Sequence, residues 1–156
     1  MAKQRDLVRM SPAEIADFIE GRRSMIVATL GKDGAPHQTV LWFAVKDGTY
    51  IFETYGSSQK VINLRRDPRV SLLWEAGVEY QELQGVSVRG RATIVDGGPE
   101  LLDLMRACVT RNVPQLSGEA LEKHVAGMAR KRVIIVVTPE DTLSWDHNKL
   151  AALKSS

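Results

Sequence analysis

The stretch SMIVATLGKDGAPHQTVLWFAVKDGTYIFETY, residues 24–55, decides the fold of this chain. Apolar, β-branched and aromatic residues form three extended runs within it, which cover residues 24–30, 37–45 and 49–55. The short sequences GKDG and KDG separate these runs, and Gly next to Asp is typical of the turns of β-hairpins. The stretch therefore predicts an antiparallel meander of three strands.

The second of these predicted strands has apolar residues on both of its faces. Side chains alternate along a strand, so Gln38, Val40 and Trp42 share one face. Leu41 and Phe43 lie on the opposite face. Because an antiparallel sheet usually packs only one face in the core, we expect the other face to be covered by a ligand or by a second subunit.

Helical signals flank and interrupt the strands. Ser11, Pro12 and Glu14 form a capping-box pattern, which predicts a helix that ends near Gly21. Further helices are predicted at residues 58–66, 100–111 and 118–131, and further strands at 70–74, 84–95, 133–137 and, as a short addition, 142–145. Gly90 inside one of these strands indicates a bulge or a close backbone approach. The order favours a mainly β fold with α-helices (α+β), in which an antiparallel sheet closes into a small barrel.

The amino-acid composition excludes several classes of protein. The chain has 156 residues, 44% of them hydrophobic and 26% charged, and we expect residues 1–156 to form a single globular domain. A formal net charge of +2 is too low for a protein whose main partner is nucleic acid. There is one cysteine, Cys108, and no apolar run long enough to span a membrane, and the charged start of the sequence leads us to expect no secretory signal. We therefore expect a cytoplasmic protein without a membrane partner.

The sequence GSSQK, which joins the third strand to the following helix, has the composition of an anion site. Gly56 permits close approach of the backbone, and the hydroxyls of Ser57 and Ser58 can donate hydrogen bonds. The helix N-terminus presents free N–H groups, Gln59 adds a neutral donor, and Lys60 adds a positive charge. The alternative is a plain helix cap followed by a solvated helix face.

Three segments, SMIVATLGKDGAPHQTVLWF, GSSQKVINLRRDPRVSLLW and VRGRATIV, resemble the pyridoxamine 5′-phosphate oxidase-like split-barrel family. They are most similar to its actinobacterial branch, which uses the deazaflavin coenzyme F-420. The resemblance covers most of the chain and implies a six-stranded antiparallel split β-barrel. It also implies a homodimer with the cofactor in a groove between the two subunits.

The resemblance assigns the cofactor phosphate to Ser58, Gln59 and Lys60. Family members that bind flavin mononucleotide (FMN) have Ser-Arg-Lys at these positions, so Gln59 replaces an arginine. One positive charge fewer makes FMN less favourable and leads us to expect F-420 as the cofactor.

The resemblance also gives the strand residues a role in cofactor binding. Gln38, Val40 and Trp42, with Phe52 and Thr54 on the next strand, would line the wall under the tricyclic ring. Taken singly, Trp42 and Phe52 are more often ordinary core residues.

The C-terminal sequence SWDHNK, residues 144–149, is rich in side chains that bind ligands. The resemblance implies that it folds against the cofactor groove, where Trp145 would pack and Lys149 would contact an anion. His147 is the best candidate for a proton donor, because histidine titrates near neutrality. The alternative is a frayed tail anchored by Trp145.

The sequence gives little support to other chemistry. The three histidines are isolated and there are no paired cysteines, so we expect no metal site. Cys108 has no base beside it in the sequence, and no catalytic side chain stands out. We therefore expect an oxidoreductase that transfers a hydride from reduced F-420 to an unsaturated organic substrate. The alternatives are an FMN-dependent oxidase or reductase, or a non-catalytic protein that binds a cofactor or a tetrapyrrole.

Overall fold

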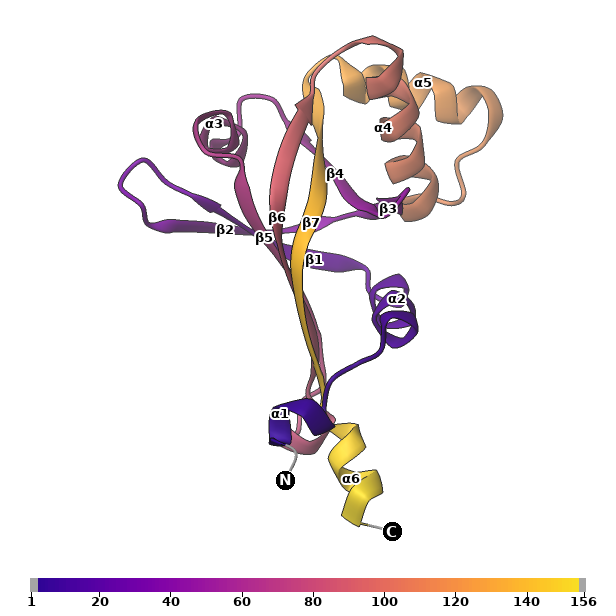
Figure 1. Ribbon diagram of the computed structural model, residues 1–156. Helices are drawn as coiled ribbons and strands as arrows, with labels where there is room; N and C mark the ends of the chain where they lie inside the picture. The colour runs from indigo at the N-terminus through magenta and orange to yellow at the C-terminus, as the bar shows by residue number, and fades with distance from the viewer. Residues whose placement is uncertain (1–2, 155–156) are drawn as a thin grey trace.

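A computed structural model describes residues 3–154 as a curled antiparallel sheet surrounded by helices (Figure 1). Within this range the sheet has seven strands in the order β2-β1-β5-β6-β7-β4-β3. The strands are β1 (Ser24–Leu30), β2 (Pro36–Trp42), β3 (Ala44–Lys46), β4 (Thr49–Tyr55), β5 (Arg69–Ala76), β6 (Gln84–Val95) and β7 (Arg132–Asp146). The predicted mainly β, antiparallel fold is confirmed, but the prediction of six strands is wrong.

The chain closes the sheet at Phe43, which divides the predicted strand at residues 37–45 into two. β2 pairs with β1 at one edge of the sheet, whereas β3 pairs with β4 at the other. The carbonyl oxygen of Phe43 accepts hydrogen bonds from Arg111 at 3.1 Å and Asn112 at 3.0 Å. The two edges are therefore joined through the chain itself, and this break creates the additional strand.

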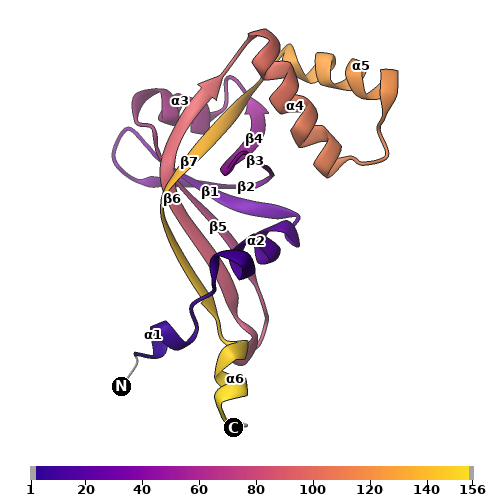
Figure 2. The same ribbon diagram turned by 45° about the vertical axis from the view of Figure 1, so that its right-hand side comes forward.

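β6 and β7 form a long ribbon that runs from the barrel to the end of the molecule where both termini lie (Figure 2). β7 is continuous over 15 residues, so the separate strands predicted at 133–137 and 142–145 are one element. The predicted irregularity at Gly90 is confirmed as a register shift between Arg89 and Gly90. A Cβ at Gly90 would lie 2.3 Å from the carbonyl oxygen of Thr138, so the backbones approach too closely for another residue.

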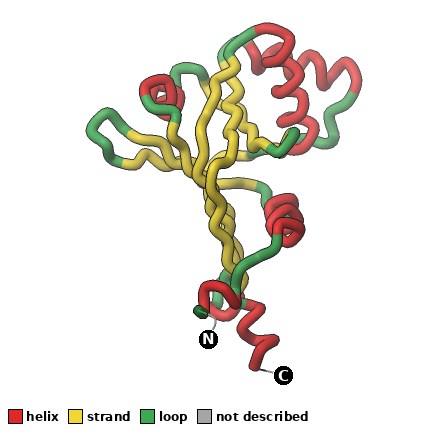
Figure 3. The backbone as a smooth tube through the Cα atoms, in the orientation of Figure 1, coloured by secondary structure: helices red, strands yellow, loops and turns green. Residues whose placement is uncertain are grey.

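The helices surround the sheet at separate places along it (Figure 3). They are α1 (Gln4–Leu7), α2 (Pro12–Glu20), α3 (Gln59–Arg66), α4 (Gly98–Asn112), α5 (Gly118–Ala129) and α6 (Asn148–Lys154), with a 3-10 turn at Tyr80–Glu82. The predicted capping box of α2 is confirmed: Ser11 Oγ accepts from the Glu14 N–H at 3.2 Å, and the Glu14 carboxylate accepts from the Ser11 N–H at 2.6 Å. No helix within residues 3–154 is long and apolar enough to cross a membrane.

Two clusters of buried side chains hold these elements together. The first fills the barrel and includes Phe43, Phe52 and Trp74, with the rings of Phe43 and Trp74 edge-on at a centroid distance of 5.3 Å. The second packs α4 and α5 against the sheet through residues such as Ile51 and Met105. Each fully buried side chain of this size contributes about 1.5–3 kcal/mol. The helical hairpin of α4 and α5 is therefore fixed on the outside of β4 by its own apolar layer.

Candidate functional site

Lys60 lies in the first turn of α3 with its amine against β4. Its Nζ donates to Thr54 Oγ1 at 3.4 Å, and the same hydroxyl lies 3.3 Å from Ser58 Oγ. Lys60 is only 8% exposed, and this burial lowers the pKa of its amine, an effect that the charge of Glu53 partly offsets. No ion pair between residues 3 and 154 includes Lys60. A buried cation with one long hydroxyl contact is stabilised by an added anion.

The N-terminal end of α3 is also suited to an anion. Ser58 occupies the N-cap position, but its side chain accepts no capping hydrogen bond from the described part of the chain. The Ser58 hydroxyl faces Thr54 instead, so the first-turn N–H groups have no side-chain acceptor. Ser57 is exposed beside them. Within the described residues the positive end of the α3 dipole therefore has no side-chain cap, which suits an anion.

A buried amide network fixes α3 on the barrel. Asn63 is fully buried, and its Nδ2 donates to Thr29 Oγ1 at 3.0 Å. Asn63 Oδ1 accepts from Gln59 Nε2 at 2.8 Å. Gln59, the residue that replaces the arginine of the FMN-binding members, thus uses one amide hydrogen within α3. It adds no charge to the group of Lys60, Thr54 and Ser58.

The exposed face of β2 carries the three residues that the alternation predicted. Gln38 is exposed, and Val40 and Trp42 are 65% and 49% exposed. Ile26 lies opposite Val40 in the register, and Leu73 lies opposite Ile26, so an apolar strip crosses three strands. We call Val40, Ile26 and Leu73 the β2–β5 strip. The guanidinium of Arg23 lies 4.3 Å from the centre of the Trp42 ring, which holds this indole at one end of the strip.

Phe52 and Thr54 face the inside of the barrel rather than the exposed face of β2. Phe52 has no exposed surface and packs in the barrel core, so it does not line a wall that a cofactor can reach. Thr54 is also buried, and its contact is with Lys60. The prediction that both residues extend the wall formed by Trp42 therefore does not hold in this structure, because the intervening residue, Glu53, is the one that faces outward.

The C-terminal segment is ordered, and the alternative of a frayed tail is wrong for residues 145–149. The indole of Trp145 covers Gly85 so closely that a Cβ on this glycine would lie 2.0 Å from the indole Cζ2. His147 Nδ1 lies 2.7 Å from the carbonyl oxygen of Tyr80, and the two rings are 4.7 Å apart. One ring nitrogen of His147, the residue considered as a proton donor, is thus occupied locally.

Lys149 ties the C-terminal segment to the N-terminal one. Its Nζ donates to the carbonyl oxygen of Arg9 and to the carboxylate of Glu14, both at 2.7 Å. α6, which carries Lys149, lies at the opposite end of the molecule from α3 in both views (Figures 1 and 2). Within one chain the structure therefore does not bring Trp145 and Lys149 to Lys60.

A pocket of about 290 Å³ opens between the helical hairpin and the outer face of β4. Its lining consists of Trp42, Glu53, Cys108, Val109, Asn112, Val113, His124, Met128 and Arg132. We call it the hairpin pocket. Only Trp42 among these residues was predicted as part of a site. Trp42 also ends the exposed face of β2, so the pocket adjoins that face.

One side of the hairpin pocket is formed by an ion pair. Arg132 donates to the carboxylate of Glu53 at 2.5 Å and to the hydroxyl of Tyr55 at 3.1 Å. Its guanidinium also stacks over the Tyr55 ring, 4.3 Å from the centre. Arg132 is therefore neutralised and held in place, so its charge is not free to attract a second anion.

Asn112 also lines the hairpin pocket. Its Nδ2 donates to the carbonyl oxygens of Phe43 at 3.0 Å and Cys108 at 2.9 Å, which fixes the orientation of the amide. Its Oδ1 is buried and accepts no hydrogen bond from any described residue. Burial raises the pKa of the neighbouring Cys108 thiol to about 12, so this cysteine is not an activated nucleophile. No group of side chains suited to a metal ion occurs within residues 3–154.

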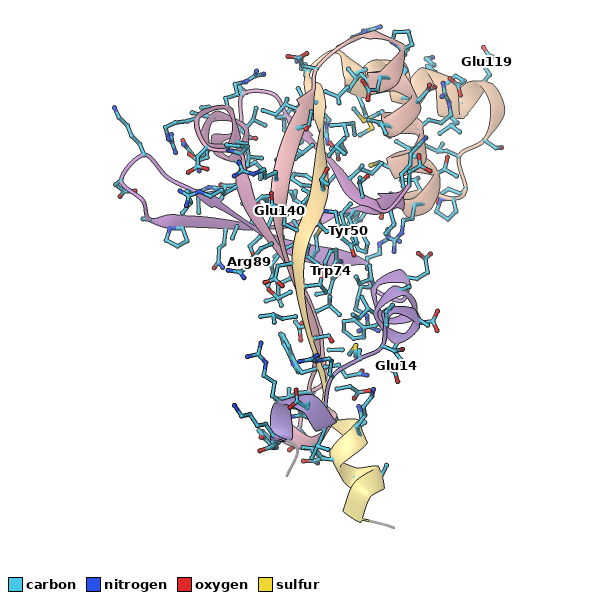
Figure 4. The ribbon with its side chains drawn as sticks, viewed as in Figure 1. Glu14, Tyr50, Trp74, Arg89, Glu119 and Glu140 are labelled. Carbon is cyan, nitrogen blue, oxygen red and sulfur yellow. The ribbon has the colours of Figure 1, made fainter. Side chains whose placement is uncertain are left out.

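A second hollow, of about 510 Å³, lies over β1, β5 and β6. Arg89 and Glu140 are at its border (Figure 4). Arg89 is paired with Asp141, and Arg91 with Glu140 at 3.0 Å. These exposed arginines already have carboxylate partners. They are a weaker anion site than Lys60.

The residues of the hairpin pocket had no local signal in the sequence. Glu53 and Arg132 become neighbours only because β4 pairs with β7, where Tyr55 lies opposite Arg132. Asn112 reaches the pocket because α4 packs across the end of β2. Such contacts between distant segments do not follow from periodicity or spacing.

Comparison with known proteins gives matches over most of the chain. A family model described as pyridoxamine 5′-phosphate oxidase matches residues 11–146. A pyridoxine/pyridoxamine 5′-phosphate oxidase from Kineococcus radiotolerans is 39% identical over 69 residues. That match spans 44% of this chain but only 30% of the curated relative.

Solved structures match the whole fold. A conserved hypothetical protein from Mycobacterium tuberculosis, Rv2991, has 43% sequence identity and a TM-score of 0.88, and the match covers 96% of this chain and 93% of that one. A protein named F420 reductase has 24% identity and a TM-score of 0.62, with 81% and 93% of the two chains covered. The heme storage protein HutZ from Vibrio cholerae has 15% identity and a TM-score of 0.68, with 85% and 94% covered. The last two similarities concern the fold alone.

Proposed function

The chain belongs to the pyridoxamine 5′-phosphate oxidase family, and on this premise we propose that it is an oxidoreductase that uses coenzyme F-420. The family supports the oxidoreductase class, and the choice of F-420 as cofactor is our own. The reaction that we propose is hydride transfer from the reduced cofactor to an unsaturated organic substrate. When bound, the deazaflavin would supply the hydride, and the protein would supply position and polarity.

The observation that carries this proposal is the buried amine of Lys60, which lacks a carboxylate partner among the described residues. A phosphate at the start of α3 would restore the favourable electrostatics that Lys60 loses by burial. The hydroxyls of Ser57 and Ser58 and the first-turn N–H groups of α3 would donate to the same phosphate. The chemistry of these donors thus fits the cofactor, as an anion site built from one charge and several neutral groups.

The tricyclic ring would lie on the exposed face of β2. Val40 and Trp42 offer apolar surface there, and Gln38 offers a polar edge. A flat ring requires this combination of an apolar floor and a few polar contacts. Phe52 takes no part, because its side chain is enclosed in the core.

The replacement of arginine by Gln59 supports F-420 over FMN. In the FMN-binding pattern, an arginine would add a second charge to the phosphate site, whereas Gln59 adds none and hydrogen-bonds to Asn63. FMN remains the competing cofactor within this family, and a tetrapyrrole without catalysis is the competing ligand outside it.

We further propose that the active form is a homodimer. The β2–β5 strip and Trp42 leave an apolar face of the sheet open in the single chain. Trp145 at the end of β7 and Lys149 in α6 belong to elements at the opposite end of the molecule from α3, so they would approach the same cofactor only if a second copy supplied them. Association through the exposed face of β2 would cover the strip and complete the groove.

Spectroscopic titration of the purified protein tests the cofactor assignment. F-420, FMN and heme are added in turn, and the absorbance and fluorescence of each ligand are followed. The proposal expects saturable binding of F-420 and weaker binding, by at least tenfold, of FMN and heme. Tighter binding of FMN or heme than of F-420 would overturn it. Light scattering with and without F-420 then measures whether the binding species is a dimer.

A further inference from the structure

The hairpin pocket has a chemistry of its own, distinct from the anion site at Lys60. Val109 and Val113 of the α4 end and Met128 of α5 give it an apolar interior. Its volume of about 290 Å³ suits a compound of one or two rings and is too small for a whole deazaflavin cofactor. Because the pocket adjoins Trp42, a compound bound there would lie next to the face of β2 that we assign to the ring.

The polar groups of the pocket mostly accept hydrogen bonds. Asn112 Oδ1 is buried without a donor among the described residues, and the amide cannot flip because its Nδ2 serves two carbonyl oxygens. A buried acceptor without a donor is unfavourable, and a donor group brought by a ligand would satisfy it. Glu53 adds a carboxylate. A ligand that brings an O–H or N–H group therefore meets more partners than one that brings only acceptors.

The charges of the pocket disfavour an anionic ligand. Arg132 is paired with Glu53 and Tyr55, so its guanidinium is already occupied. Cys108 stays neutral because burial raises the pKa of its thiol. His124 is exposed on α5 and contributes to the lining of the pocket. A phosphate or carboxylate inside the pocket would lie beside the Glu53 carboxylate, and the nearby guanidinium groups of Arg132, Arg23 and Arg111 already donate to other groups.

We propose that the hairpin pocket binds the organic substrate, and that this substrate is a neutral, flat compound of one or two rings with an O–H or N–H donor. Asn112 and Glu53 would select it against phosphorylated and carboxylated compounds of the same size. That this ligand is the substrate depends on the proposed function, whereas the selectivity of the pocket for a neutral donor depends only on the residues that line it.

Three ring compounds that differ in one group test this selectivity: 2-naphthol, 2-naphthoate and 2-naphthyl phosphate. Each is titrated into the cofactor-free protein by calorimetry, with amide NMR to locate the site. We expect 2-naphthol to bind at least tenfold tighter than either anion, with shifts at the end of α4. Equal or tighter binding of the anions would overturn the proposal.

Two variants and a matched control test whether 2-naphthol binds in the hairpin pocket and whether Glu53 gives the selectivity. Met128→Trp fills the pocket from α5 and should weaken 2-naphthol at least tenfold, whereas Ala126→Trp, at an exposed position of the same helix, should leave it unchanged. Glu53→Gln should reduce the preference for 2-naphthol over 2-naphthoate to less than threefold, because the repelling charge is removed while Arg132 keeps its own. Equal effects of the two tryptophan variants, or an unaltered preference in Glu53→Gln, would contradict the assignment.

Titration of F-420 into the same proteins separates this inference from the proposed function. Met128→Trp should still bind F-420, because Lys60 and the start of α3 are untouched. If the wild-type protein binds 2-naphthol selectively but not F-420, the proposed function fails and the ligand class of the pocket stands. If it binds F-420 but shows no preference among the three naphthalenes, the ligand class proposed for the pocket is wrong while the proposed function is unaffected.

Discussion

The amine of Lys60 and the hydroxyl of Thr54 meet at 3.4 Å across the junction of α3 and β4, inside the barrel end rather than in solvent. This long contact leaves a charge enclosed with little compensation. This enclosed charge gives the proposed cofactor site its preference for an anion. Its effect can be measured in the affinity for the cofactor and in the stability of the folded protein.

Lys60→Met should weaken F-420 binding by roughly ten- to a hundredfold, because a hydrogen bond to a charged group contributes about 1.5–3 kcal/mol. The measurement is a fluorescence titration of F-420. Arg65→Met is the matched control on the same helix, since Arg65 is exposed and pairs with Asp96 at 3.7 Å. An affinity of Lys60→Met within twofold of wild type would rule out the phosphate assignment.

The same variant should change stability in a pH-dependent way. Burial lowers the pKa of Lys60 from its usual 10.5, so the folded chain binds fewer protons than the unfolded chain between the two pKa values. The cost of the buried charge is full below the folded pKa and disappears as pH rises toward 10.5. Lys60→Met should therefore be more stable than wild type near neutral pH, with a gap in melting temperature that narrows at high pH. A gap that stays constant or widens with pH would contradict this expectation.

Gly85→Ala and Gly127→Ala make the same chemical change but should change the free energy of unfolding in opposite directions. At Gly85 the new Cβ would lie 2.0 Å from Trp145, so the indole must move and the protein should lose about 1–3 kcal/mol. At Gly127, within α5, nothing lies within 4 Å, and alanine should stabilise the helix by about 0.5–1 kcal/mol. Chemical denaturation gives both values, and tryptophan fluorescence reports the displacement of Trp145. Two variants of equal stability would show that Trp145 does not pack on Gly85.

Cys108 should be inert in the folded protein. With its thiol pKa raised to about 12 by burial, the thiolate fraction near pH 8 is on the order of 10⁻⁴, and a disulfide reagent also lacks access. Reaction with Ellman's reagent should be slow until guanidinium unfolds the chain, and then complete. Rapid reaction of the native protein would mean that α4 opens readily from the sheet.

Ser11→Ala should lower the free energy of unfolding by about 1 kcal/mol, because the first turn of α2 loses a capping hydrogen bond. For a chain of this size the melting temperature should fall by about 2–4 °C. Ser11→Asp is the control, since aspartate also caps helices and should retain most of the stability. Equal losses in both variants would indicate that the capping box contributes nothing.

Features that depend on neighbouring residues could be predicted from the sequence. The capping box at Ser11, the irregularity at Gly90 and the alternation of faces along β2 each follow from a short local pattern, and each is confirmed in the structure. The cover expected for the outer face of β2 stays a prediction. The local pattern at residues 58–66 also predicted α3, and the structure shows Lys60 in its first turn, buried beside Thr54. Binding of a cofactor there stays a prediction.

Features that depend on distant residues could not be predicted. The alternating run through Phe43 looks like a single strand, but its break depends on Arg111 and Asn112, which reach its carbonyl oxygen from α4. Phe52 and Trp42 have the same aromatic character in the sequence, yet the curl of the sheet buries one and exposes the other. The Glu53–Arg132 pair requires the pairing of β4 with β7, which alternation alone does not fix.

The passage of the chain through Phe43 also determines where the polypeptide tolerates being cut. Circular permutation is feasible in principle because α1 and α6 lie at the same end of the molecule (Figure 2). New ends in the hairpin between Gly31 and Ala35 would interrupt only a turn, with β1 and β2 still paired. New ends at Phe43 would remove the link between β2 and β3, which joins the two edges of the sheet, and the barrel would open into a sheet.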